Sequence, residues 1–169
     1  IPLIGQPYLE WQKALGGSAE DIPRVVEQTA DGGFIVAGQT RSVDGDVSVA
    51  HGWTDYWVVK LDNYGTMEWE SSFGGTHHDL AWDIFPTNDG GYIVAGSSES
   101  EDGQVTGHHG LDDYWVVKMD SLGTMEWQKT YGGSKDDQGQ QVIQTADGGY
   151  AVTGYAQSDD GDGSNNEGF

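Results

Sequence analysis

The chain repeats itself at an interval of 58 residues, and this period constrains its fold more than any other feature. The stretch DYWVVKLDNYGTMEW at 55–69 returns as DYWVVKMDSLGTMEW at 113–127 with three differences. A fixed period of this kind indicates supersecondary units that pack on their neighbours. We interpret 1–169 as a single repeat array with these parts: an N-terminal strand segment at 1–8, repeats at 9–66 and 67–124, and a truncated repeat at 125–169.

Each period contains four segments with strand character, which in the first copy are RVVEQT, FIVAGQT, YWVVKLD and TMEWESSF. Asp31 and Gly32 predict a tight primed turn between the first two, and Gly65 predicts a longer hairpin turn with a left-handed glycine between the last two. The FIVAG segment is apolar on both faces, as expected for a strand sandwiched between sheets. No segment has a convincing helical period, so we expect almost no helix.

Four antiparallel strands per repeat predict an all-β fold of β-propeller-type blades, about three in number with the last one incomplete. Trp11, Trp69 and Trp127 share one repeat position, which is typical of a packing layer between blades. The extra length relative to common propeller repeats lies in the connection between the second and third strands. Connections of that length are usually functional or specially stabilised.

In this register the chain carries eleven expected strands, beginning with a fourth strand and ending with a second. A longer array, a ring completed by several chains, or an open stack would each explain the unfinished blade. We expect self-association into a ring or filament, by strand complementation and blade stacking, because an open strand edge invites pairing. The expected assembly residues are Ile1, Leu3, Ile4 and Phe169.

Charge limits the possible partners. The sequence has 28 acidic and 7 basic residues, a net charge of -21. Such a surface repels a phosphate backbone, so we expect no nucleic-acid partner. The apolar runs are far shorter than the ~20 residues that span a bilayer, so we expect no membrane insertion. Cysteine is absent, which removes disulfides and thiolate chemistry from consideration.

Aspartates in and around the long connections are the best candidate ligands, and calcium is the cofactor they suggest because it binds carboxylate oxygens. The twelve-residue calcium loop is not matched, and Gln104 stands where the first copy has Asp46. Asx turns without metal explain the same residues equally well. The candidate metal ligands are Asp44, Asp46, Asp55, Asp102, Asp112, Asp113, Asp160 and Asp162.

Other candidate sites have weaker support. The histidines lack a recognised zinc-ligand spacing. Trp53 and Trp82 do not recur as tryptophan, which makes them the candidate contacts for a glycan. Carboxylates are abundant, but no nucleophile triad, phosphate loop or metalloprotease motif accompanies them, so we do not expect an enzyme.

The pattern DGGYIVAG…DGDV…HG..DYWVVKLD..G..EW…GG resembles the β-propeller repeats of about 60 residues in secreted and cell-surface proteins of bacteria, especially Bacteroidota. The resemblance covers almost the whole chain, apart from the unfinished third blade and the absence of a C-terminal sorting domain. It implies export to the extracellular space or cell surface and a scaffold or adhesion role, with no substrate attached. We therefore expect a secreted or surface-exposed structural protein that self-assembles, with a carbohydrate-binding or adhesion module as the alternative.

Overall fold

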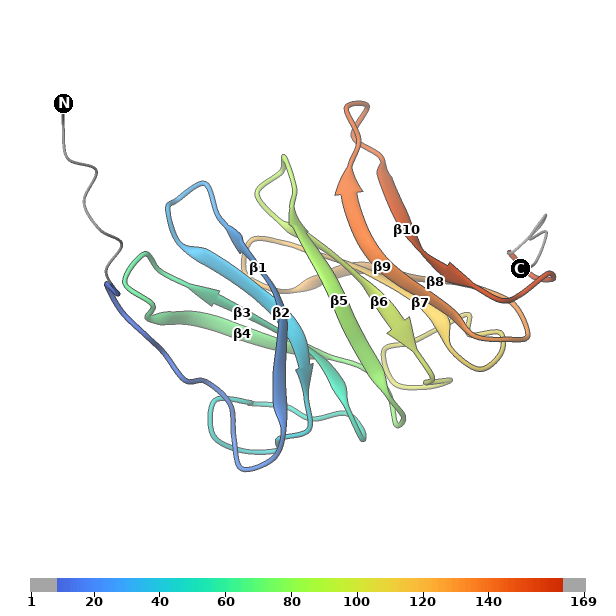
Figure 1. Ribbon diagram of the computed structural model, residues 1–169, viewed down its shortest axis with the longest axis horizontal. Coiled ribbons are helices and arrows are strands. Elements are labelled where there is room, and N and C mark those ends of the chain that lie inside the picture. Colours follow the sequence, from blue (N-terminus) through green and yellow to red (C-terminus); the bar gives the residue numbers. More distant parts are fainter. Residues whose placement is uncertain (1–8, 163–169) are drawn as a thin grey trace.

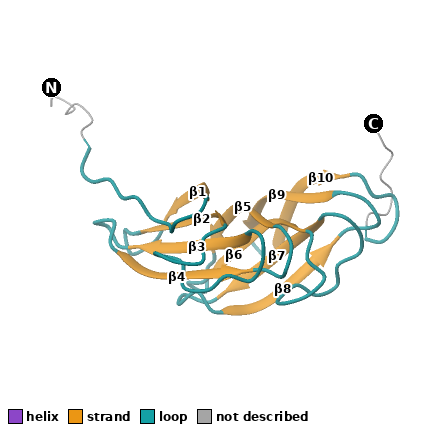
Figure 2. Ribbon diagram, turned by 90° about the horizontal axis from the view of Figure 1, so that it is seen from below, coloured by secondary structure: helices purple, strands orange, loops and turns teal. Residues whose placement is uncertain are grey.

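The computed structural model describes residues 9–162, which form ten strands in three antiparallel sheets (Figure 1). The strand orders are β1-β2-β3-β4, β5-β6-β7-β8 and β9-β10. The described residues contain strands and loops but no helix (Figure 2), which confirms the all-β prediction. The strands are β1 (Asp21–Gln28), β2 (Phe34–Thr40), β3 (Asp55–Leu61), β4 (Met67–Phe73), β5 (Asp79–Pro86), β6 (Tyr92–Ser98), β7 (Asp113–Met119), β8 (Met125–Tyr131), β9 (Asp137–Gln144) and β10 (Tyr150–Ala156).

Ten of the eleven expected strands are present among the described residues. The exception is the segment 9–15, which the repeat register equates with β4 and β8 but which forms no strand. In the two complete sheets the fourth strand is hydrogen-bonded to the third, as β4 is to β3 and β8 to β7. The segment 9–15 has no such third strand beside it in the described chain, so its backbone lacks the partner that would fix it as a strand.

The hairpin turn between β1 and β2 differs from the predicted primed turn. The Gly32 N–H donates to the Thr29 carbonyl at 2.9 Å, and the Thr29 N–H donates to the Gly33 carbonyl at 3.0 Å. The turn is therefore a three-residue loop that ends in a left-handed glycine, with φ of 85° at Gly32. The Asp31 carboxylate caps it by accepting the Gly33 N–H at 2.9 Å. Because of this hydrogen bond, Asp31 is held as a residue of the three-residue loop, directly before Gly32.

The sheets pack face to face, and the middle sheet is covered on both sides (Figure 1). Val58 of the first sheet and Val117 of the second belong to one buried cluster. The Tyr56 hydroxyl donates to the Trp115 carbonyl at 2.9 Å across this interface. Every residue of β6 is buried between two neighbouring sheets. The FIVAG segment in β2, for which this burial was predicted, has Phe34 and Val36 only half-buried. β10, in the last sheet, is largely exposed.

The recurring tryptophan forms a contact layer between sheets, as expected. Trp69 lies edge-on to Tyr92 with ring centroids 5.9 Å apart. Trp11 meets Phe34 edge-on at 5.6 Å, and Trp127 meets Tyr150 in a tilted contact at 5.7 Å. Trp11 takes this position although its segment forms no strand. The indole ring of Trp11 therefore keeps its packing position even though segment 9–15 does not form the hydrogen bonds of a strand.

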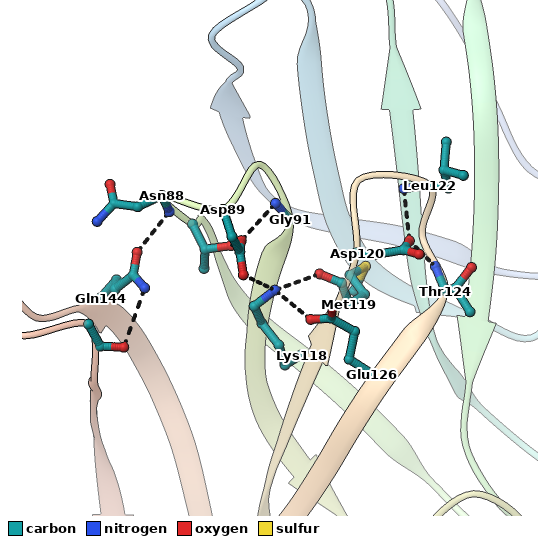
Figure 3. Close-up of polar contacts among 12 residues, drawn as sticks. Asn88, Asp89, Gly91, Lys118, Met119, Asp120, Leu122, Thr124, Glu126 and Gln144 are labelled. Atoms are coloured by element: carbon teal, nitrogen blue, oxygen red, sulfur yellow. Dashed lines mark hydrogen bonds and ion pairs between the residues drawn. The ribbon is translucent and has the colours of Figure 1, made fainter.

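A buried lysine connects the hairpins of each complete sheet. Lys118 is 2 % exposed, and its ammonium lies 2.8 Å from Glu126 Oε2 and 3.0 Å from Asp89 Oδ2 (Figure 3). It also donates to the Met119 carbonyl at 3.0 Å. Burial alone would lower the pKa of Lys118, but Glu126 and Asp89 raise it, so the lysine stays charged. Lys60 makes the equivalent contacts in the first sheet with Asp31 and Glu68.

Candidate carboxylate sites in the loops and between the sheets

The long connections 41–54 and 99–112 lie between the second and third strands, where the excess length was predicted. In the first of them, Asp44 Oδ1 accepts the Ser18 N–H at 2.7 Å and Asp46 Oδ2 accepts the Gly16 N–H at 3.0 Å. Gly45 between them has a φ of 69°, which lets the two aspartates approach the same loop. These carboxylates therefore fasten the connection to the glycine-rich loop that precedes β1.

The other two copies of the loop both repeat the Asp44 contact, and the second copy also repeats the Asp46 contact. Asp102 Oδ1 accepts the Thr76 N–H at 2.8 Å, and Asp160 Oδ1 accepts the Ser134 N–H at 2.8 Å. Gln104 Oε1 accepts the Gly74 N–H at 3.0 Å, which is the bond that Asp46 makes in the first copy. The Asp162 N–H donates to the Gly132 carbonyl at 2.9 Å. An amide oxygen and a carboxylate serve equally well here, which explains how glutamine replaces aspartate.

The remaining candidate metal ligands, Asp55, Asp112 and Asp113, lie at the ends of the long connections. Asp112 accepts a hydrogen bond from Gln138 Nε2 at 2.7 Å. Burial raises the pKa of Asp112, and the nearby Glu99 and Asp136 carboxylates raise it further. Within residues 9–162, no group of three or more histidine, cysteine, aspartate or glutamate side chains converges as a metal site.

Asp55 meets a second buried aspartate where the first two sheets join. Asp55 opens β3 and is 1 % exposed, and Asp79 opens β5 and is 0 % exposed. Asp55 Oδ2 accepts the His51 N–H at 2.8 Å, whereas Asp55 Oδ1 is buried without a hydrogen-bond partner. A side-chain carbon built on Gly74 would lie 2.2 Å from Asp55 Oδ1 and 2.6 Å from Asp79 Oδ2. The two oxygens therefore share the space beside this glycine.

The same arrangement recurs between the second and third sheets. Asp113 Oδ2 accepts the His109 N–H at 2.6 Å, and Asp113 Oδ1 is buried without a partner. A carbon built on Gly132 would lie 2.1 Å from Asp113 Oδ1 and 3.1 Å from Asp137 Oδ2. We call Asp55 with Asp79, and Asp113 with Asp137, the junction pairs.

Burial makes ionisation of the first junction pair, Asp55 with Asp79, costly. It raises the pKa of Asp79 to about 6, against hydrogen bonds from Ser98, Gly75 and Ser100 that lower it, and the Asp55 carboxylate raises it further. Burial also raises the pKa of Asp55, although the His51 and Gly52 N–H groups lower it. Two such carboxylates side by side resist carrying two negative charges at once.

Trp53 and Trp82, the candidate glycan contacts, occupy different surroundings. Trp53 is 63 % exposed, and its ring lies 5.3 Å from that of His77 and 5.4 Å from that of His78. Trp82 lies on β5 with the Arg24 guanidinium 4.5 Å above its ring. Its indole nitrogen is buried without a hydrogen-bond partner. Only Trp53 presents most of its side chain to solvent.

The outer face of the first sheet is hollowed. A cavity of about 520 Å³ lies over it, lined by apolar residues that include Trp57, Val59 and Val36. Val26 at its edge is 59 % exposed, whereas its repeat equivalent Ile84 in the second sheet is 1 % exposed. The expected assembly residues Ile1, Leu3, Ile4 and Phe169 lie outside the described residues.

Sequence reasoning did not assign Asp79, Asp137, Lys60 or Lys118 to any site. The signal was present, because Asp21, Asp79 and Asp137 share one repeat position. Lys60 and Lys118 likewise recur together with their acidic partners. Recurrence shows that a polar residue is needed, but it does not say which group on another strand it meets.

A scan against protein-family models and a search of curated protein sequences found no match to this chain. In the part of the chain that the structure describes, no helix has the length and hydrophobicity needed to cross a membrane.

Proposed function

We propose that this protein is a non-catalytic structural repeat protein whose sheets are propeller-type blades and whose role is to assemble into a larger ring or filament. The observation that carries the proposal is the apolar hollow on the outer face of the first sheet. The equivalent face of the second sheet is covered by the first sheet, so the same surface is an interface at one repeat and open at the other.

The contacts between successive sheets support stacking of like on like. β1 contacts β5, and β5 contacts β9, so the first strands of successive sheets lie next to one another, as in a propeller. The Tyr56 hydroxyl bonds the Trp115 carbonyl of the following sheet. Another sheet of the same kind would place an equivalent tyrosine over Trp57 and fill the outer hollow.

Strand complementation is supported by the edge of the third sheet. β2 and β6 each pair with a strand on both sides, but β10 pairs only with β9 among the described residues. A third strand with the DYWVVK pattern fits this edge, because β3 and β7 occupy that place in the other sheets. We propose that such a strand comes from another copy of the chain, since exposed edges favour pairing.

Secretion or display on the cell surface is part of the proposal. It rests on the resemblance to exported bacterial repeats and accords with the net charge of -21, which keeps a protein soluble.

Val26→Glu tests the stacking. Val26 is 59 % exposed, so the charge should be tolerated in a free chain but not in a face buried as Ile84 is. Wild type should give a mass by light scattering that is a multiple of 18.2 kDa, and the variant should dissociate with unchanged circular dichroism. Val43→Glu is the matched control, because Val43 is 75 % exposed in the long connection. A monomeric wild type would contradict self-assembly, as would equal behaviour of the two variants.

A glycan-binding or adhesion role is the second candidate, and the exposure of Trp53 favours it. An indole ring braced by His77 and His78 offers a face on which a sugar can stack. Binding to a glycan array that is lost in Trp53→Ala and kept in Trp82→Ala would favour this role. An array without signal for wild type would remove it.

A further inference from the structure

The unpartnered Oδ1 atoms of Asp55 and Asp113 call for a ligand. Both atoms are buried, and both belong to side chains that are at most 1 % exposed. A buried carboxylate oxygen without a donor or counter-ion is strongly destabilising unless it is neutralised. Each of these oxygens lies beside the same glycine as an oxygen of the second aspartate of its junction pair, so the neighbouring side chain increases the demand for positive charge.

An internal comparison shows that the junction creates this demand. Asp21 holds the repeat position of Asp79 and accepts similar bonds, from Thr40 Oγ1 at 2.5 Å, Ser42 Oγ at 2.8 Å and the Gly17 N–H at 2.8 Å. Burial raises the pKa of Asp21, but these bonds outweigh it and leave the pKa lowered. The three atoms nearest a carbon built on Gly16 all belong to Asp21, whereas a carbon built on the equivalent Gly74 meets both Asp55 and Asp79. The two unpartnered carboxylate oxygens therefore lie where two sheets bring two aspartates together.

We propose that each junction pair binds one calcium ion, between Asp55 and Asp79 at the first junction and between Asp113 and Asp137 at the second. Two carboxylates carry the charge that one divalent cation neutralises, and both donors are the hard oxygens that calcium prefers. Magnesium is less suited, because it gives up its water reluctantly and these side chains are buried. The remaining ligands come from backbone carbonyls or water. Gly74 and Gly132 leave space that any side chain would fill.

The site differs from the calcium loop expected from the sequence. The loop carboxylates of Asp44, Asp102 and Asp160 already accept backbone N–H groups, whereas each junction pair retains a free oxygen. Its two aspartates come from different sheets, so calcium would tie one sheet to the next. The proposal does not depend on self-assembly, because both junctions lie within one chain.

Thermal unfolding in chelator and in millimolar calcium tests the proposal at neutral pH. Wild type should gain roughly 5 °C or more in calcium over an equal concentration of magnesium, which controls for general screening. The double variant Asp55→Asn with Asp113→Asn should lose this gain, because each amide removes one of the two charges of its pair and supplies an N–H to the second aspartate. The matched control, Asp44→Asn with Asp102→Asn, changes loop carboxylates and should keep the gain.

Three results would overturn the proposal. The first is a calcium effect no larger than that of magnesium. The second is an equal calcium gain in the junction and loop variants, which would place the ion elsewhere. The third is a wild type that ignores calcium but is stabilised by mild acid, which would show that the pairs share protons. If the junction variants do not fold, equilibrium dialysis of wild type with calcium decides, since one ion per junction supports the proposal and no bound ion refutes it.

Discussion

An aspartate at one repeat position has a different acidity in each sheet, and this difference arises from its neighbours. Asp21 and Asp79 both follow a glycine pair and both accept hydroxyl and backbone N–H bonds. The pKa of Asp21 is lowered, and burial together with Asp55 raises the pKa of Asp79 to about 6. At Asp21 the hydrogen bonds outweigh the effect of desolvation on the pKa. At Asp79, which lies at the junction of two sheets, desolvation outweighs the hydrogen bonds.

The two aspartates should therefore give pH dependences of opposite sign. Asp79 has a pKa of about 6 in the folded state and 3.8 as its ordinary value, so its protonated form favours folding and its contribution is lost as pH rises from about 4 to about 6. Urea unfolding in chelator should show that the free energy of unfolding of wild type, relative to that of Asp79→Asn, falls by up to roughly 3 kcal/mol as pH rises across that window.

Asp21→Asn is the control for this experiment. The pKa of Asp21 is lowered in the folded state, so its contribution is present above its ordinary pKa and is lost as pH falls. The free energy of unfolding of wild type, relative to that of Asp21→Asn, should therefore increase as pH rises. Curves of the same sign for the two variants would contradict the assignment of opposite environments.

At the scale of elements, the turn before each fourth strand also forms part of the contact between sheets. Gly65 and Gly123 have φ of 78° and 79°, as the sequence predicted for a left-handed glycine. A carbon built on Gly123 would come within 2.7 Å of the Trp69 ring. The glycine is therefore required twice, by its own turn and by the tryptophan of the preceding sheet.

Gly123→Ala and Gly90→Ala separate these two requirements. Gly90 has a φ of 84° with nothing within 4 Å of the added carbon, so its substitution should cost only the left-handed conformation, about 1 kcal/mol. Gly123→Ala must also displace Trp69 and should cost roughly 2 to 4 kcal/mol in total. Chemical denaturation measures both, and equal costs would show that the indole moves freely.

At the scale of the whole molecule, charge of one sign opposes compaction. The net charge of -21 is spread over a chain with only 7 basic residues. Two of these, Lys60 and Lys118, are buried in the sheets, where each forms ion pairs with two carboxylates and offsets one of their two negative charges. The remaining carboxylates repel one another across the surface, which destabilises the folded state relative to an expanded chain.

Moderate salt should stabilise the protein for this reason. Raising sodium chloride from about 20 mM to about 500 mM shortens the Debye length to below 5 Å and screens the repulsion between exposed carboxylates. The melting temperature should rise by several degrees, and the same increase in ionic strength from a second monovalent salt should act equally. A falling melting temperature would mean that attraction between charges outweighs repulsion.

The repeat pattern predicted much of the fold and part of the candidate site. Strand positions, the left-handed glycines, the tryptophan layer and the placement of the long connections follow from local alternation and the 58-residue period. The turn at Asp31 was wrongly predicted, because capping by its own side chain competes with the primed turn. The candidates Asp55 and Asp113 were named, but their partners Asp79 and Asp137 were not.

The sequence by itself determined that this protein is built from like units of antiparallel strands, because alternation of apolar residues and the chemistry of glycine act over a few neighbouring positions. Only the tertiary structure decided that Lys60 is buried among carboxylates and that Asp55 faces Asp79 with one oxygen unpaired. These relations join residues on different strands and sheets. They depend on how one sheet docks on the next, which the order of residues along a strand does not specify.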